Sequence, residues 1–299
     1  MRTPSPTPDS LGRAFSIRDA ATAGLAYGRL RGRDLGRPFH GVRTTSPADS
    51  LLGRCADYAP RMRADEFYCS VTAALIHGLP LPLAHERDPR LHVAVPNPRR
   101  APRSRGIVGH KFIVQPARGE VIEVAGFRVS SPERAWCELG AILDFRELVR
   151  AGDQLIRPAN RLSSASQLRA TLERHPARRG RETLHAAFAQ LNPGAESPPE
   201  TDLRLLCIEA ELTGFVANLT VTIPGAGRRR RIDIAFVREK VALEYQGDHH
   251  RDPRQWREDM TRLAELESIG WKVTHVNADD LRDPRALVAR IRRVLAAHS

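Results

Sequence analysis

Two neighbouring segments carry acidic and amide side chains at spacings that could support metal chemistry. RIDIAFV (231–237) and VALEYQG (241–247) alternate as strands do, with a short charged interval between them, so the sequence predicts a β-hairpin. Facing residues in an antiparallel pair have numbers with a constant sum, and a two- or four-residue loop here makes that sum odd. We therefore expect Asp233 to share a face with Glu244 and Gln246.

The opposite face of this predicted hairpin is apolar, which supports the same register. A slip of one residue would turn every side chain to the other face and expose the apolar set to water. We expect this face to pack against the core. Its residues are Ile232, Ile234, Phe236, Leu243 and Tyr245.

Two carboxylates on one sheet face repel each other and lose hydration, which is costly unless a cation compensates. The oxygens of Asp233 and Glu244 suit magnesium or manganese, which keep several waters and bind through one or two carboxylates together with substrate phosphate oxygens. Such an ion polarises a scissile phosphate and lowers the pKa of an attacking water. Gln246 has no titratable proton, so we expect it to orient that water or a phosphate oxygen.

This order of residues resembles the core of the PD-(D/E)XK nuclease superfamily, with Gln246 where that family most often has lysine. The similarity is closest to uncharacterised domains related to the very-short-patch-repair endonucleases, and it covers the C-terminal third of the chain. It implies a restriction-endonuclease-like α/β/α domain that hydrolyses DNA phosphodiester bonds with magnesium or manganese. Superfamily members with altered third positions differ in activity, so turnover stays open. The matching residues are Glu244, Gln246, Gly247, His250, Asp259, Arg262, Gly270, Trp271 and Val273.

Three further residues are candidate accessory groups of this site. Glu200 lies in the first turn of a helix predicted over 199–214, where the family places an acid and where the helix dipole alone also favours one. His250 follows the second strand, and we expect it to protonate the leaving oxygen or hold a phosphate, although loop histidines are often only solvated. Arg262 could reach a phosphate, and its alternative is a surface ion pair with Asp259.

The chain is strongly basic, and its positive charge comes almost entirely from arginine. The formal net charge is +12, and all but Lys111, Lys240 and Lys272 of the 47 basic residues are arginines. Guanidinium groups fit phosphate oxygens two at a time, which makes nucleic acid the first partner to consider, although a GC-rich genome also favours arginine. The arginines expected to track a DNA strand beside the acidic pair are Arg228, Arg229, Arg230 and Arg231.

Near the N-terminus, the pattern is typical of a small helix-turn-helix with a one-strand wing. A first helix is predicted between an N-cap at Ser16 and a stop at Gly24, a second over Tyr27 to Leu35, and an extended segment over 39–43. An ordinary helical hairpin that caps the next domain fits the same pattern.

Residues 15–43, together with SVTAALIHGLPLP (70–82) and LHVAVP (91–96), resemble the AbiEi-type antitoxin and transcriptional-regulator proteins. The resemblance implies a winged helix that binds DNA in front of a mixed domain, and it leaves a homodimer and a toxin or defence-system partner open. The candidate contacts are Arg29, Arg31 and Arg33, for which a solvated helix face is the alternative.

The whole chain is expected to be a mixed α/β protein in three parts. These are a tail and winged helix-turn-helix over 1–45, a mixed α+β middle domain over 46–191, and the nuclease domain over 192–299, after a linker rich in Pro and Gly. In the middle domain the pattern predicts strands over 91–96, 106–114 and 121–130.

The four cysteines show no metal-ligand spacing, and we expect them to be reduced core residues. No apolar run is long enough to span a bilayer, and the first ten residues are polar, so the sequence predicts a cytoplasmic protein without a membrane partner. The function expected is a metal-dependent endodeoxyribonuclease with a DNA-binding regulator-like module. The alternatives are a catalytically inactive repressor or type IV antitoxin-like protein and, less favoured, an RNA-processing enzyme.

Overall fold

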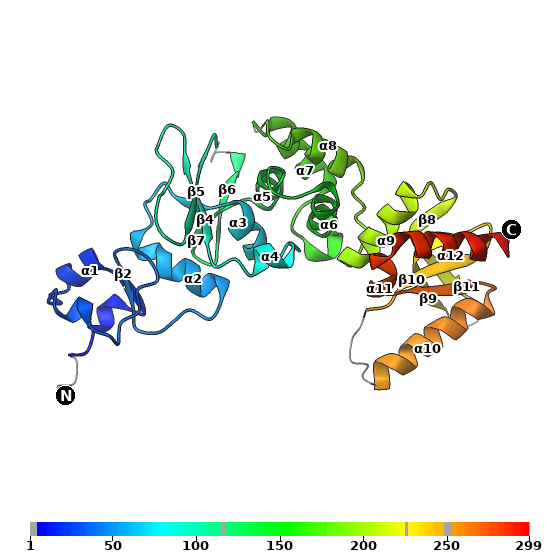
Figure 1. Cartoon of the computed structure of the whole chain (residues 1–299), viewed down its shortest axis with the longest axis horizontal. Coiled ribbons are helices and arrows are strands. Elements are labelled where there is room, and N and C mark those ends of the chain that lie inside the picture. The colour runs from blue at the N-terminus through cyan, green and yellow to red at the C-terminus, as the bar shows by residue number, and fades with distance from the viewer. Residues whose placement is uncertain (1–4, 115–117, 177, 225–226, 248–252, 299) are drawn as a thin grey trace. The chain divides into compact units, whose positions relative to one another are not determined.

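A computed structural model describes residues 5–114, 118–176, 178–224, 227–247 and 253–298, which form a mixed α/β structure with three sheets (Figure 1). Contacts within the chain divide it into two compact units. Unit 1 holds residues 1–147 and 165–185, and unit 2 holds residues 148–164 and 186–299. The boundaries expected at residues 45 and 191 stay predictions.

The start of unit 1 is a two-stranded antiparallel sheet of β1 (Ala14–Ser16) and β2 (Val42–Thr44), with the helix α1 (Ile17–Thr22) between them. Ser16 begins α1 as expected, because its hydroxyl accepts the Asp19 amide while Asp19 reaches back to the Ser16 amide. The helix expected over 27–35 is wrong. Only a 3-10 helix, Arg29–Arg31, forms there, and the glycines Gly28 and Gly32 stand at its two ends.

Unit 1 continues with a five-stranded sheet in the order β5-β4-β3-β7-β6. Its centre is β3 (Phe67–Tyr68) beside β4 (Leu91–Pro96), and one edge is β5 (Ile107–Phe112). Two of the expected strands are therefore confirmed in position. The helices of this unit are α2 (Leu51–Tyr58), α3 (Ser70–Ile76), α4 (Leu83–Glu86), α5 (Pro132–Leu139), α7 (Ala165–Arg174) and α8 (Arg181–Ala189), which continues past the end of the unit.

The single strand expected over 121–130 is instead a hairpin of β6 (Val121–Val124) and β7 (Phe127–Ser130). The turn residues Ala125 and Gly126 both have positive φ, 51° and 80°, which is the conformation that a two-residue hairpin turn requires. Alanine rarely adopts a positive φ, so the apolar pattern of residues 121–130 gave no indication of a turn at Ala125.

Unit 2 contains a four-stranded sheet in the order β11-β10-β9-β8. The strands are β8 (Phe215–Ile223), β9 (Arg228–Phe236), β10 (Val241–Tyr245) and β11 (Lys272–Val276). β8, β9 and β10 are antiparallel neighbours, whereas β11 runs parallel to β10. The helices are α6 (Phe145–Ile156), which begins in unit 1, α9 (Pro198–Glu209), α10 (Pro253–Ser268), α11 (Ala278–Arg282) and α12 (Pro284–Ala296).

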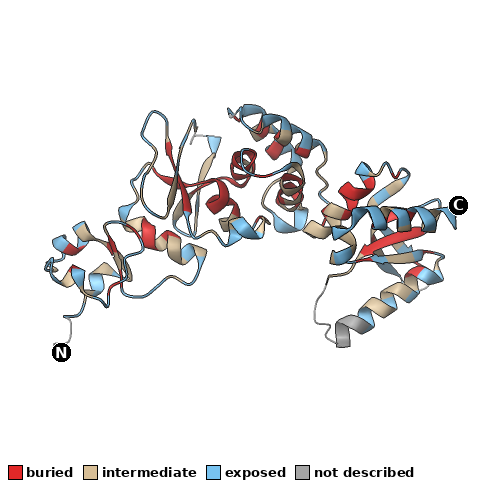
Figure 2. Ribbon diagram, in the orientation of Figure 1, coloured by how far each residue is buried: buried red, intermediate tan, exposed pale blue. Residues whose placement is uncertain are grey.

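Apolar clusters on the two faces of this sheet produce an α/β/α arrangement. On one face, residues of β9 and β10 pack against α9 and α12, with Leu206 and Ile291 as examples. On the other face, Ala235 and Ala242 pack against Leu266 of α10 and against Trp271. Buried residues accordingly gather in the strands and in the helix faces that cover them (Figure 2).

The register of the β9–β10 hairpin is the predicted one. Phe236 faces Val241 and Ile234 faces Leu243, so facing numbers have an odd sum. Ile232 departs from the expected apolar face, because it packs with the α10 cluster. The regular pairing of β8 with β9 is interrupted just beside it, where Asn218 has a φ of 56°.

The segment 148–164 joins unit 2 through the buried carboxylate of Asp153. Its Oδ1 accepts the Asn192 amide at 2.7 Å, and its Oδ2 accepts the Thr201 hydroxyl at 2.7 Å and Arg204 Nη2 at 2.9 Å. A buried charge is tolerated when it is paired and hydrogen-bonded in this way. This network attaches α6 to the linker and to α9.

The cysteines Cys55, Cys69, Cys137 and Cys207 are buried and free, as expected. Burial raises the pKa of Cys55 and Cys207 to about 12, so both thiols stay protonated at neutral pH. Among the described residues, no helix is long and apolar enough to cross a membrane.

Candidate functional site

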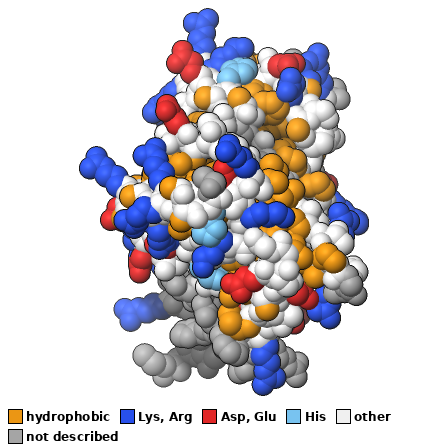
Figure 3. Space-filling model, turned by 90° about the vertical axis from the view of Figure 1, so that its right-hand side faces the viewer, with side chains coloured by type: hydrophobic (Ala, Val, Ile, Leu, Met, Phe, Trp, Pro, Cys, Tyr) orange, Lys and Arg blue, Asp and Glu red, His pale blue; other side chains and the backbone are white. Residues whose placement is uncertain are grey.

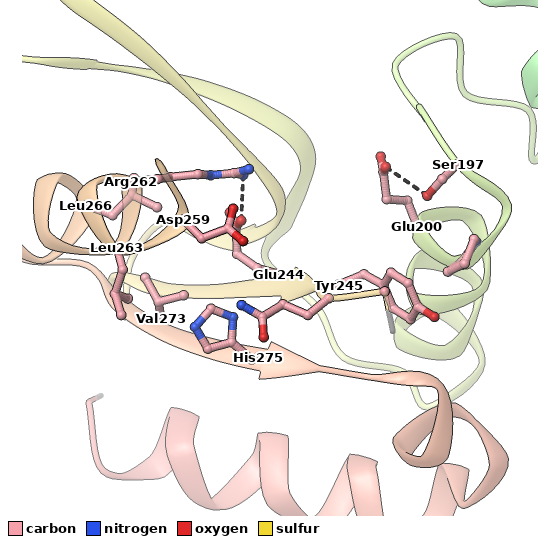
Figure 4. Close-up of a pocket in the computed structure, with 13 residues that line it drawn as sticks. Ser197, Glu200, Glu244, Tyr245, Asp259, Arg262, Leu263, Leu266, Val273 and His275 are labelled. Carbon is pink, nitrogen blue, oxygen red and sulfur yellow. Dashed lines mark hydrogen bonds and ion pairs between the residues drawn. The ribbon is translucent and has the colours of Figure 1, made fainter. Parts of the chain in front are cut away.

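A cavity of about 620 Å³ opens on the α10 side of the unit 2 sheet (Figure 4). Its walls come from the start of α9, the end of β10, the middle of α10 and β11. The polar and charged side chains that line it are Ser197, Glu200, Glu244, Tyr245, Gln246, Asp259, Arg262 and His275.

Glu244 is the most buried acid of this cavity, with 7% of its surface exposed. It lies on β10, which has a strand on either side, and this central position removes it from water. Its Oε2 is 2.5 Å from Arg262 Nη2, whereas its buried Oε1 has no hydrogen-bond partner among the described residues. Burial raises the pKa of Glu244 to about 7, Arg262 opposes this rise, and the charge of Asp233 adds to it.

Asp233 lies across from Glu244, at the point where β9 and β10 separate. The paired positions end at Ile234 and Leu243, and beyond them Asp233 Oδ2 accepts the backbone amide of Tyr245 at 2.9 Å. Burial and the nearby charge of Glu200 together raise the pKa of Asp233 to about 6. The two carboxylates therefore influence each other, as the predicted register requires.

Within the described parts of the chain, no group of three or more His, Cys, Asp or Glu side chains is placed to hold a metal ion. Magnesium, however, needs only one or two protein carboxylates when waters and phosphate oxygens complete its shell. The partnerless Oε1 of Glu244 beside a second carboxylate is the kind of donor that such an ion would satisfy. The residues present thus fit magnesium or manganese held by Asp233 and Glu244.

Glu200 has four protein donors around its carboxylate. Oε1 accepts the Ser197 hydroxyl at 2.9 Å, and Oε2 accepts the Glu196 amide at 3.0 Å and Arg231 Nη2 at 2.9 Å. Asn218 Nδ2 lies 3.4 Å from the same Oε2. These bonds hold the first turn of α9 to β9, and Glu200 contributes to the site mainly through its charge.

Arg262 of α10 points toward the sheet and pairs with Glu244, as Figure 4 shows. The alternative, a surface pair with Asp259, does not form among the described residues, although Asp259 lines the same cavity. Arg262 Nη2 also donates to the backbone oxygen of Arg231 at 2.5 Å. One guanidinium therefore ties α10 to both β9 and β10.

Gln246 and His275 complete the floor of the cavity. The backbone amide of Gln246 donates to the Val276 oxygen at 2.8 Å, which continues the parallel pairing of β10 with β11 beyond the last strand residue. In that pairing His275 lies beside Glu244 on the same face, and it is exposed to the cavity. His275 was not among the site residues predicted from the sequence. The alternation of β11 puts His275 on the same face as Val273, but only the pairing of β11 with β10 shows that it lies beside Glu244.

The predicted arginine cluster on β9 is largely engaged in ion pairs. Arg228 and Arg230 lie 3.0 and 2.5 Å from the carboxylate of Glu265, and Arg231 pairs with Glu196 and Glu200. Many other Arg and Lys side chains reach the surface, as the face drawn in Figure 3 illustrates. Arg229 is exposed, and no ion pair involves it in the described parts of the chain.

The N-terminal candidates lie in unit 1. Arg29 pairs with Asp34 at 2.6 Å and donates to the Ser5 oxygen, whereas Arg31 and Arg33 are exposed. His250, the proposed acid, lies outside the described residues. The structure thus brings Asp233, Glu244, Gln246, Glu200 and Arg262 together.

No family model matches the chain. It is 27% identical over 270 residues to uncharacterised proteins from two strains of Mycobacterium tuberculosis, CDC 1551 and H37Rv, and the alignment covers 89% of this chain and 94% of each relative. Among solved structures, the catalytic domain of the homing endonuclease I-Bth0305I is similar over 33% of this chain and 95% of that domain, at 20% identity and a TM-score of 0.27. The RV2827C protein of Mycobacterium tuberculosis is similar over 71% of this chain and 84% of that protein, at 15% identity and a TM-score of 0.39. Values this low assign neither a family nor a shared fold.

Proposed function

We propose that this protein is a metal-dependent endodeoxyribonuclease that hydrolyses phosphodiester bonds at the unit 2 cavity. The observation that carries the proposal is the buried Glu244 Oε1, which has no hydrogen-bond partner in the described chain, next to the second acid Asp233. Two desolvated carboxylates are costly to keep together unless a cation joins them. A divalent ion would satisfy both oxygens and be positioned to meet a phosphate.

Asp233 and Glu244 would hold magnesium or manganese, and the burial of Glu244 limits competition from water. When bound, the ion supplies polarisation of the scissile phosphate and a lowered pKa for the attacking water. Gln246 is at the cavity floor, where its amide can orient a water or a phosphate oxygen but cannot remove a proton. Arg262 fixes Glu244 and offers its guanidinium to a phosphate, and Glu200 holds Arg231 in place.

DNA is the substrate that the charge favours. The formal net charge is +12, and arginines such as Arg229 lie on the strand that carries Asp233. Polyanions are attracted by such a surface in a salt-dependent way. In this proposal His250 protonates the leaving oxygen, while Arg31 and Arg33 in the N-terminal part contact DNA phosphates.

The second candidate is a DNA-binding repressor or antitoxin-like protein without turnover. Two observations favour it: glutamine instead of a cationic lysine at position 246, and the tie between Arg262 and Glu244. Both leave the site with less free positive charge to stabilise a developing phosphate charge. A protein of this kind would bind the same DNA and leave it intact.

A plasmid-nicking assay with magnesium or manganese distinguishes the two. We expect metal-dependent nicking by the wild type and loss of nicking by Asp233→Asn. Asp279→Asn is the matched control, because Asp279 is an exposed acid whose ion-pair partner among the described residues is the exposed Arg282. Absence of nicking by the wild type with every metal, while DNA is still retarded, would establish the repressor. Labelled RNA under the same conditions tests the RNA-processing alternative.

A further inference from the structure

Unit 1 contains a second cavity, of about 590 Å³, whose walls carry four arginines. Arg61 and Arg63 come from the segment after α2, and Arg100 and Arg103 come from the loop between β4 and β5. This loop leads from β4 into β5, the strand at one edge of the five-stranded sheet. A hollow of this size accepts a ligand about as large as a nucleotide.

The wall on the α2 side is held rigid by hydrogen bonds. Arg61 Nη1 donates to the His40 oxygen at 2.5 Å. Arg63 Nε lies 3.1 Å from Glu66 Oε1, and its backbone amide donates to Glu66 Oε2 at 3.0 Å. Arg63 Nη2 also reaches the Arg100 oxygen at 3.4 Å, which joins the two walls. Such prior ordering reduces the entropy lost when a ligand binds.

The acids near this cavity already have cationic partners. Glu66 is 4% exposed and pairs with Arg63, and Asp65 Oδ2 lies 2.8 Å from Arg99 Nε. These two acids therefore neutralise Arg63 and Arg99, but they do not neutralise the other arginines of the loop between β4 and β5.

Arg100 and Arg103 retain uncompensated charge. In the part of the chain that the structure describes, neither side chain has an ion pair or a hydrogen bond to protein, and the same holds for the neighbouring Arg105. The buried hydroxyl oxygen of Ser104, between them in sequence, also has no hydrogen-bond partner there. Concave, unpaired guanidinium groups beside a free hydroxyl are suited to phosphate oxygens, which accept several donors at once.

We propose that this cavity is a second nucleic-acid site, which holds the phosphodiester backbone of DNA through Arg100, Arg103 and Ser104. It is separate from the N-terminal arginines considered above and from the acidic site of unit 2. The inference does not depend on cleavage, since phosphate contacts bind DNA whatever the other unit does.

The test measures binding of a labelled DNA duplex by fluorescence anisotropy, over a range of salt concentrations. The protein is the full chain with Asp233→Asn, in EDTA, so that hydrolysis plays no part. We expect R100E/R103E to raise the Kd at least tenfold at low salt and to lower the slope of log Kd against log salt by about two, one for each lost phosphate contact. The Kd of R100K/R103K should lie between that of the unaltered cavity and that of R100E/R103E, because lysine keeps the charge but loses the forked geometry.

The matched control is R87E/R174E, which changes the net charge by the same amount at two exposed arginines of unit 1 outside the cavity. Equal weakening by both double charge reversals, or an unchanged salt slope in R100E/R103E, would overturn the proposal. So would a deoxynucleoside monophosphate that binds the wild type at a concentration where the duplex does not, because the ligand would then be a free nucleotide. Circular dichroism melting verifies that each variant is folded.

Discussion

Arg262 and Glu244 form an ion pair in which only one oxygen of the carboxylate is neutralised. Nη2 is 2.5 Å from Oε2, while Oε1 is buried and has no hydrogen-bond partner among the described residues. Arg262 opposes the burial that raises the pKa of Glu244 to about 7, and the pair leaves one carboxylate oxygen available to a metal ion. Its energetic consequences can be measured.

Arg262→Met is expected to destabilise unit 2 by about 1–2 kcal/mol, because it leaves a buried carboxylate without its cation while Arg262 itself is partly exposed. Magnesium should restore more stability to this variant than to the wild type, since the ion replaces the lost charge. Thermal melting with and without magnesium measures both effects. Arg282→Met, which removes an exposed partner of Asp279, should change neither. If magnesium leaves the melting temperature of Arg262→Met unchanged, the proposed metal site is contradicted.

Gln246→Ala is expected to lower the nicking rate roughly 10²-fold, as loss of a positioning group does, with little change in DNA affinity. Gln246→Lys should keep or increase the rate, because a cation at this position can also stabilise the phosphate charge. Single-turnover rates and Kd values separate the two effects. If Gln246→Ala nicks as fast as the wild type, Gln246 does not position the reacting groups.

Asp153→Ala should destabilise unit 2 by about 3 kcal/mol, because it leaves the buried Arg204 without its partner. Asp202→Ala is the control: its pair with Arg150 is more exposed and is expected to contribute under about 1 kcal/mol. Urea denaturation compares the two. Replacing Arg204 by Leu in the Asp153→Ala background should recover part of the loss, and failure to do so would show that the charge is not its cause.

Unit 1 is expected to lose stability in mild acid through His92 and His110. His92 Nδ1 lies 3.0 Å from His110 Nε2, and burial, with the charge of His110, lowers the pKa of His92 to about 4. Burial also lowers the pKa of His110. The unfolded chain therefore binds protons first: stability is complete above pH 6.5 and falls as the pH approaches 4.

The free energy of unfolding from urea denaturation should be about 2 kcal/mol lower at pH 5 than at pH 7 from His92 alone. His92→Gln cannot be protonated, so this difference should shrink in that variant. His185→Gln, at an exposed histidine of helix α8, should leave the difference unchanged. The same pH dependence in His92→Gln as in the wild type would assign the effect to other groups.

The sequence by itself determined those features that depend on near neighbours. Loop length and alternation established the β9–β10 register, and thereby the proximity of Asp233 and Glu244, because an antiparallel hairpin is a local structure. The helix start at Ser16 was predictable for the same reason, since a cap acts within one turn.

Only the tertiary structure decided which distant residues join the site. β11 pairs in parallel with β10 after an intervening helix, and no local spacing specifies that His275 lies beside Glu244. In the same way, the packing of α10 pairs Arg262 with Glu244, whereas the spacing along the helix had suggested a pair with Asp259. Asp153 likewise binds Asn192 and Arg204, which are distant from it in the sequence. These choices follow from burial and charge pairing summed over the whole unit, which a local pattern does not contain.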